Sequence, residues 1–329
     1  MKYFKNLLLL IILPLFAMGE TTYYGEDAYD LGIPLDAFAL GKIKAVSLTM
    51  PALGGIASSY YDDSRMSFNH SSGFGGIYNT DILQWRKGDK NISIFRGAVD
   101  EIADTRNALV DNGLDGEANT YDIGEGNGIL DPGERLNVNK IDFFSVSQWV
   151  IEGGYSKAYS DRIKLYGAAR ILLHNLYTQT GFGIGFHAGV EAEPIEHLRL
   201  GLMITDILTT TIFWSDGLIE NYAPQASLGV VYEYKSKRTP FAFKPVLQYK
   251  MSGLEDANGF AFGLEMGFKD QVFLRSGRDD TGFVTLGAGI KTHYLQIDYA
   301  TFISDIHATS GQTHRVGISF SPEKLFFKK

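Results

Sequence analysis

The chain has 329 residues, a net charge of −8 and no cysteine. The acidic balance argues against binding nucleic acid, whose affinity comes largely from Lys and Arg on phosphates, and the lack of cysteine excludes disulfides and thiolate metal sites. Glycine accounts for 37 residues and aromatic residues for 13% of the chain. A glycine share above the usual ~7%, together with many aromatic residues, favours short alternating strands.

The first 19 residues are predicted to be a secretory signal peptide. Lys2 and Lys5 form a basic start, residues 7–16 are an apolar run, and Ala17 and Gly19 are the small residues of a cleavage site. The apolar run is too short for a membrane-spanning helix, which needs about 20 residues. The alternative is a buried N-terminal helix. The signal interpretation predicts an exported protein.

Residues 20–62 show no strand pattern. They begin acidic and rich in tyrosine, and continue with small and apolar residues such as 37–41 (AFALG) and 51–55 (PALGG). This irregular segment precedes a long series of alternating runs that begins at about residue 63.

The alternating runs have one apolar face and one face of glycine with scattered charge. In residues 180–193, for example, Phe182, Ile184 and Phe186 alternate with glycines and His187. Each run is about ten residues long, the length of a tilted membrane strand. A soluble sandwich also alternates, but its polar face would carry more Lys and Glu and less Gly. The fourteen predicted strands are 63–70, 75–86, 90–98, 142–159, 163–177, 180–193, 198–209, 224–234, 241–250, 258–268, 271–277, 282–292, 294–302 and 312–320.

The connections between these strands alternate in length. Turns after even-numbered strands are mostly tight, as at 87–89, whereas connections after odd-numbered strands include 99–141 and 210–223. Outer-membrane barrels have short periplasmic turns and long external loops. The sequence therefore predicts an all-β fold over residues 63–329, a transmembrane antiparallel β-barrel of about 14 strands in the lipid of the bacterial outer membrane. Residues 99–141 are its predicted long external loop.

Three stretches resemble the PorV/PorQ family of outer-membrane proteins, distant relatives of the FadL long-chain fatty-acid transporters. They are residues 68–77 (FNHSSGFGGI), the glycine-rich acidic insert 112–134, and 201–207 (GLMITDI). The family's Trp-Asn-Pro-Ala-Gly-Leu motif is replaced by residues 51–55, without Trp or Asn. The resemblance implies a fourteen-stranded barrel whose N-terminal segment, residues 20–62, enters the lumen as a plug or hatch.

The acidic insert 111–134 contains candidate calcium ligands. Asp111, Asp115, Gly116 and Asp122 match positions 1, 5, 6 and 12 of an EF-hand loop, but position 3 is glycine and cannot supply a side-chain oxygen. A second group offers more oxygen ligands on a glycine-rich backbone, which suits Ca²⁺ with its about six to eight oxygen ligands. The alternative is a solvated acidic loop. The second group is Asp122, Glu125, Asn127, Asp131 and Glu134.

A set of charged residues falls on the lumen-facing side of the predicted strands. They either line a pore and set its selectivity, or pair with each other and with residues 20–62 in a filled interior. We predict the filled interior. Similarly, the apolar residues 34–56 form either an apolar pocket in the lumen or ordinary plug packing. The predicted lumen-facing charges are Lys164, Arg170, Glu191, Arg199, Lys291, Asp298 and Arg315.

Catalysis is not expected, because the sequence holds no HExxH, GxSxG or Walker A motif. No organic cofactor is expected either. Two functions remain. In the first, which the resemblance to PorV implies, the barrel is a docking or structural component of the envelope or of type IX-like protein secretion, with secretion-machinery or cargo proteins as partners. In the second, which the resemblance to FadL implies, it is a passage for hydrophobic small molecules such as long-chain fatty acids.

Overall fold

The computed structural model describes residues 39–48, 50, 53–56, 64–252, 258–303 and 313–326. The predicted signal peptide and the first part of the N-terminal segment lie outside the described residues, so the signal peptide stays a prediction.

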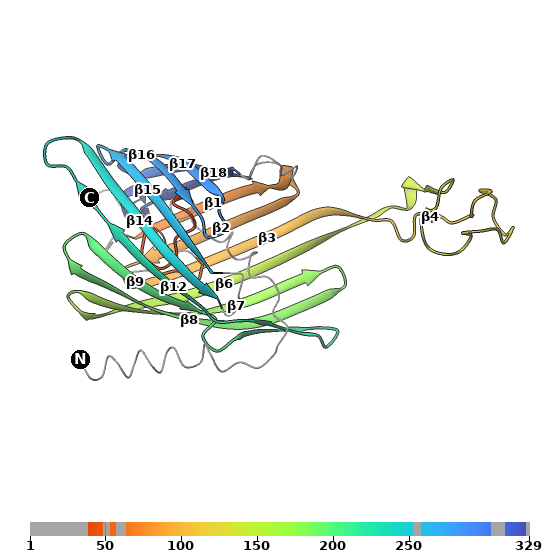
Figure 1. Ribbon diagram of the computed structural model, residues 1–329, viewed down its shortest axis with the longest axis horizontal. Coiled ribbons are helices and arrows are strands. Elements are labelled where there is room, and N and C mark those ends of the chain that lie inside the picture. The colour runs from red at the N-terminus through yellow and green to blue at the C-terminus, as the bar shows by residue number, and fades with distance from the viewer. Residues whose placement is uncertain are drawn as a thin grey trace.

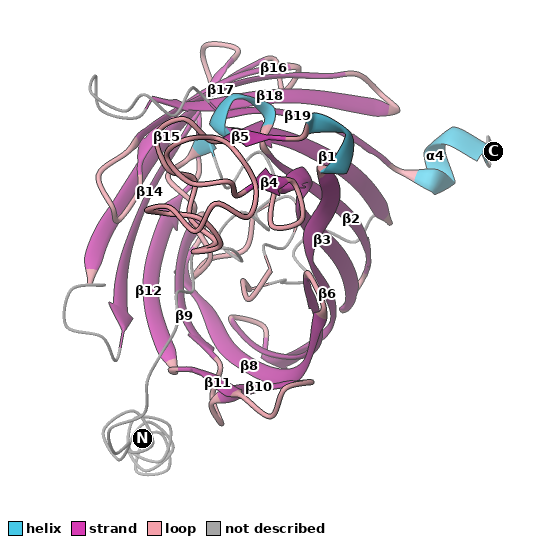
Figure 2. Cartoon of the chain, turned by 90° about the vertical axis from the view of Figure 1, so that its right-hand side faces the viewer, coloured by secondary structure: helices cyan, strands magenta, loops and turns pink. Residues whose placement is uncertain are grey.

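Fourteen long strands of the described chain form one closed antiparallel barrel. The last strand, β19, pairs with both β18 and β1, which closes the ring. Figure 2 looks along the barrel axis from one end and shows the strands surrounding the interior. The predicted all-β barrel of 14 strands is therefore confirmed. The strands are β1 (Arg65–Gly73), β2 (Tyr78–Lys87), β3 (Lys90–Asp104), β6 (Asp142–Ser160), β7 (Ile163–Leu176), β8 (Gln179–Ile195), β9 (Leu198–Thr205), β12 (Gln225–Tyr232), β14 (Phe241–Ser252), β15 (Gly259–Phe268), β16 (Val272–Arg278), β17 (Val284–Lys291), β18 (Leu295–Ile303) and β19 (Thr313–Phe320).

Alternation along the strands gives the barrel an apolar exterior. On β8, Phe182, Ile184 and Phe186 are each about half exposed, whereas the glycines between them are buried on the inner face. Large apolar side chains are also exposed on β2, β7 and β15, for example Leu83, Leu173 and Phe262, so they cover the outer wall. A closed barrel with such a wall satisfies its backbone hydrogen bonds internally and faces lipid. The protein is a barrel of the bacterial outer membrane.

In the described part of the chain, the barrel is followed by one short α-helix, α4 (Pro322–Phe326). Among the residues that the structure describes, no helix is long and apolar enough to cross a membrane.

The two ends of the barrel differ in the length of their connections. At one end, which we call the turn end, strands are joined by short turns such as those between β2 and β3 and between β6 and β7. At the other, the loop end, β3 and β6 are separated by residues 105–141 and β9 and β12 by 206–224. In outer-membrane barrels the long loops face the exterior of the cell.

Strands β3 and β6 extend beyond their neighbours and form a projecting arm. Their pairing continues past a bulge between Val99 and Ile102 to the Asp104–Asp142 pair. The sequence placed the end of this strand at residue 98, because alternation is lost at the bulge. The arm carries the small sheet of β4 (Leu109–Val110) and β5 (Arg135–Leu136) and the short helix η3 (Val138–Lys140), and it reaches far from the barrel in Figure 1.

The loop predicted at residues 210–223 contains a hairpin. It is formed by β10 (Thr210–Trp214) and β11 (Ile219–Tyr222), and β10 also pairs with β8. Strand β9 ends at Thr205, four residues before the predicted end, and the chain turns at Asp206 and Thr209, both with positive φ. Two further short elements are the 3₁₀ turn η2 (Phe74–Gly76) and β13 (Tyr234–Lys235).

The described part of the N-terminal segment, residues 39–56 without 49, 51 and 52, lies inside the barrel, and we call it the inner segment. Its residues are almost all buried. It packs with inward-facing side chains into three apolar clusters, for example Leu40 and Ile43 with Val231 and Val246. The barrel therefore has a packed interior at this level.

Candidate functional site

Polar side chains of the barrel wall hold the backbone of the inner segment. The N–H and Oγ of Ser47 donate to the carboxylate of Glu191 at 2.5 and 2.8 Å. The N–H groups of Lys44 and Ala45 donate to Oε1 of Gln248 at 2.7 and 2.8 Å. Because a buried N–H without an acceptor costs free energy, the wall supplies the hydrogen bonds that an irregular segment cannot make with itself.

Glycines on the inner face allow the inner segment to lie directly against the wall. A Cβ atom at Gly201 would collide with the carbonyl oxygen of Ala45, and one at Gly229 would lie 2.9 Å from the Cβ of Ala45. Next to Gly263, the backbone of Leu40 fills the corresponding space. The glycine-rich inner face is therefore, at these positions, a contact surface for the inner segment.

An apolar layer crosses the inner wall of β2, β3, β6 and β7. Each of these strands contributes one inward residue, and each residue lies directly opposite the next in the strand register. All four side chains are fully buried, and Leu53 of the inner segment packs against them. The β10–β11 hairpin completes this cluster. Its members are Leu53, Ile82, Phe95, Val150, Leu172, Ile212 and Tyr222.

A buried charged cluster lies one layer closer to the turn end. Glu152 stands opposite Arg170 in the register, and Arg170 pairs with Asp206. Glu152 accepts a hydrogen bond from the N–H of Gly54 at 3.0 Å and lies 3.4 Å from Nε2 of His187. Buried charges are tolerated only when they are paired and hydrogen-bonded. The cluster brings opposite charges together and at the same time attaches Gly54 to the wall.

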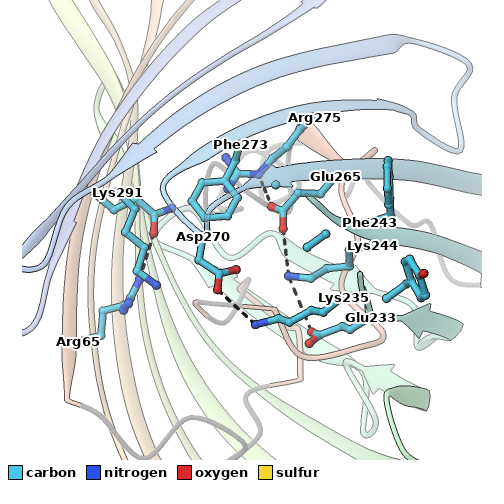
Figure 3. Close-up of a pocket in the computed structure, with 14 residues that line it drawn as sticks. Arg65, Glu233, Lys235, Phe243, Lys244, Glu265, Asp270, Phe273, Arg275 and Lys291 are labelled. Atoms are coloured by element: carbon cyan, nitrogen blue, oxygen red, sulfur yellow. Dashed lines mark hydrogen bonds and ion pairs between the residues drawn. The ribbon is translucent and has the colours of Figure 1, made fainter. Parts of the chain in front are cut away.

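A chain of ion pairs crosses the inner wall nearer the turn end (Figure 3). Nζ of Lys244 lies 3.8 Å from Glu233 and 3.2 Å from Glu265. Arg275 lies 2.6 Å from Glu265 and 2.6 Å from Asp298. These charges neutralise each other across five strands or strand ends, so they act as structural pairs of the interior.

A cavity of about 270 Å³ borders this chain of ion pairs. Arg65, Lys235 and Lys291 add positive charge to its lining, and Phe273 adds an aromatic ring. Lys235 is paired with Asp270 at 3.6 Å. Among the residues that the structure describes, the inner segment therefore fills the interior at mid-height, and this cavity lies nearer the turn end.

The seven predicted lumen-facing charges lie on the inner wall but do not form one site. Arg170 belongs to the buried cluster and Asp298 to the chain of ion pairs. Glu191 and Arg199 both bind Ser47 of the inner segment. Lys164 and Lys291 are half-buried and Arg315 is fully buried.

The sequence did not predict the apolar layer or most of the buried cluster. The alternation does place these residues on the inner face, because Val150 and Glu152 are both inward residues of β6, and Leu172 and Arg170 are both inward residues of β7. Only the cross-strand register aligns these residues in layers, and periodicity does not give that register.

The acidic loop, residues 111–134, is held together by carboxylates that accept backbone N–H bonds. Asp111 accepts from Gly126 and Gly128, each at 2.7 Å, and Glu134 accepts from Gly113 and Asp131 at 2.8 and 2.9 Å. The pKa of the Asp111 carboxyl group lies below its ordinary 3.8, and the main cause is the hydrogen bond from the N–H of Gly128.

The predicted calcium ligands are also engaged in hydrogen bonds within the loop. Glu125 accepts from the N–H groups of Asn119 and Tyr121, Asp122 accepts from Asp115, and Asn127 donates to Asp131. In the part of the chain that the structure describes, no three His, Asp or Glu side chains are grouped to hold a metal ion. Calcium binding stays a prediction. A heat of Ca²⁺ binding in calorimetry that disappears in Asp122→Ala would support it.

Comparisons with known proteins gave matches only among solved structures. No family model matches the chain, and no curated protein matches it either. The toluene transporter TbuX of Ralstonia pickettii is 10% identical, covers 88% of this chain and 97% of its own, and has a TM-score of 0.47. The toluene transporter TodX of Pseudomonas putida is 9% identical, with 91% and 97% covered and a TM-score of 0.46. A FadL homologue of Pseudomonas aeruginosa is 10% identical, with 92% and 99% covered and a TM-score of 0.42. These values are too low to assign a family, a ligand or a mechanism.

The fold and the interior define the class of the protein without these likenesses. It is a fourteen-stranded outer-membrane β-barrel whose lumen holds an internal segment of its own chain. Membership of the PorV/PorQ family and the absence of enzymatic activity both stay predictions.

Proposed function

We propose that the barrel is a passage for hydrophobic small molecules across the outer membrane, and that the inner segment is its hatch. The observation that carries the proposal is the apolar layer on the inner wall. Lumens of water-filled porins are polar, whereas here four adjacent strands turn Ile82, Phe95, Val150 and Leu172 inward at one level. A hydrophobic solute that replaces Leu53 would find an apolar surface.

The hydrogen bonds of the inner segment suit a part that moves. The wall binds the backbone of the inner segment at a few residues, such as Ser47 and Gly54. The wall side chains that bind these residues belong to β6, β8 and β9. Hydrogen bonds to charged groups contribute about 1.5–3 kcal/mol each, so the segment can leave the wall only where water or a solute replaces these bonds.

A reversible covalent lock tests the proposal. The chain has no cysteine, so a double variant, Ala45→Cys with Gly229→Cys, offers a single pair of thiols. The Cβ separation of 2.9 Å is slightly below the ~3.5–4.5 Å of a disulfide, and a small shift of the segment accommodates the bond. Oxidation should fix the inner segment to the wall.

The readout is uptake of a radiolabelled long-chain fatty acid by cells that lack their own channel for it. We expect uptake by the native chain and by Ala45→Cys alone, no uptake by the oxidised double variant, and recovery after reduction. No uptake by the native chain would contradict the passage. Equal uptake by the locked and reduced forms would contradict the hatch and leave the passage standing.

The docking function that the resemblance to PorV implies also remains a proposal. It is supported by the arm of β3 and β6, which extends beyond the neighbouring strands and carries the acidic loop away from the membrane. Neither function excludes the other, since the hatch and the arm lie in different parts of the molecule. Type IX secretion would be supported by association with the secretion machinery and contradicted by its absence in purified outer membranes.

A further inference from the structure

The base of the arm is braced where it leaves the barrel. Arg106 donates to both carboxylate oxygens of Asp104, at 2.9 and 2.6 Å, and its guanidinium lies 4.5 Å from the ring centroid of Tyr177 in the β7–β8 turn. The same ring packs edge-on against Phe144 of β6. These contacts fix the direction of the arm relative to the barrel.

The acidic loop at the tip of the arm is ordered without an apolar core. Its carboxylates take the place of a core, because Asp111 binds N–H groups 15 and 17 residues away and Glu134 binds one 21 residues away and one 3 residues away. Hydrogen bonds of this kind, with a charged acceptor, are the stronger ones. The loop therefore keeps a defined backbone while its apolar side chains remain outside.

Large apolar side chains project from this loop into solvent. Tyr121 is 92% exposed and Ile123 85% exposed, and the main chain of Ile123 is hydrogen-bonded to that of Leu114, another exposed residue. An extended arm is beyond the lipid, so the membrane does not explain this exposure. Exposed apolar side chains on a fixed framework are typical of protein-binding surfaces. The exposed apolar residues of the arm tip are Leu114, Tyr121, Ile123, Ile129, Leu130 and Val138.

The charge around these side chains selects the partner. Residues 111–134 contain seven acidic side chains and no Lys or Arg. Such a surface repels an anionic membrane and favours a basic protein surface, which also speeds association. We propose that the arm tip is a docking site for a protein whose contact surface is basic and contains an apolar pocket, into which Tyr121 or Ile123 inserts.

Site-specific photo-crosslinking tests this proposal in the intact protein. A benzoyl-phenylalanine is placed at Tyr121. The control position is Tyr159, which is 75% exposed and lies at the turn end of the barrel, next to the β6–β7 turn. Outer membranes of the organism's own cells are irradiated and adducts are identified by mass spectrometry. We expect one protein adduct from position 121 only, with the crosslinked peptide rich in Lys and Arg.

Two further measurements test whether opposite charge and an apolar contact hold the partner. The yield of the adduct should fall about tenfold between low and high salt, because the surfaces are held by opposite charge. It should fall again in Ile123→Ser, whose barrel folding is checked by heat-modifiable migration on a gel. The proposal is overturned by an adduct with lipid or with a second copy of this chain, by equal adducts from both positions, or by no adduct.

Discussion

Substitution of Gly201 by valine should loosen the inner segment. Gly201 lies on the inner face of β9, and any Cβ at this position would occupy the space of the Ala45 carbonyl oxygen and approach Val46 Cγ1 to 3.2 Å. Valine suits a strand, so β9 itself should tolerate the change. The strain therefore falls on the inner segment, which must move away from the wall.

The expected effect follows from the cost of overpacking, which is about 1–3 kcal/mol for an extra side chain in a well-packed interior. If this cost falls on the closed position alone, the population of segments displaced from the wall rises about 5–150-fold. The barrel should remain folded, because its strands are hydrogen-bonded to one another around the closed ring.

Thiol labelling measures the fraction of molecules whose inner segment is displaced from the wall. Ala45 is fully buried, so the maleimide labelling rate of an Ala45→Cys variant reports how often the segment leaves the wall. Gly201→Val should raise that rate by the factor given above. The control is Gly153→Val, since none of the described residues lies within 4 Å of a Cβ at Gly153. Equal rates in the two variants would refute the argument that the glycine surface holds the segment closed.

Three further outcomes are expected. Asp206→Ala removes one carboxylate partner of the buried Arg170 and should lower stability to denaturant by about 3–5 kcal/mol; unchanged stability would contradict the pairing. The lowered pKa of Asp111 means that its contribution to loop stability is complete above pH 3.8 and is lost as pH falls through the lowered value. Amide exchange of Gly126 should therefore be protected at pH 5 and lose protection only in strong acid, and Asp111→Ala should remove the protection at pH 5. Deletion of residues 312–320 removes β19, which pairs with β18 and β1, and should abolish membrane insertion; normal heat-modifiable migration would refute this.

The barrel could be predicted from the sequence because each strand carries its own signal. One face must be apolar against lipid, and on β8 this gives Phe182, Ile184 and Phe186 between inward glycines. The alternation of short and long connections then fixed the number of strands, and the observed strands differ from the predicted ones mainly at their ends.

The interior could not be predicted in the same way, because it depends on contacts between distant residues. Glu152 and Gly54 are 98 positions apart, and Gln248 and Ala45 are 203 apart. From the sequence, glycines such as Gly201 are expected to face an open lumen. In the structure, the backbone of the inner segment lies against them, and only glycine leaves room for it. The β10–β11 hairpin also escaped prediction, since its pairing with β8 is decided by tertiary structure.

The central claim is that the inner segment closes an apolar passage, and uptake through the Ala45→Cys, Gly229→Cys variant tests it most directly. The account predicts that fatty-acid uptake stops on oxidation and returns on reduction, while Ala45→Cys alone is unaffected. Uptake that continues at the same rate in the oxidised form, with the crosslink verified by mass spectrometry, would contradict it.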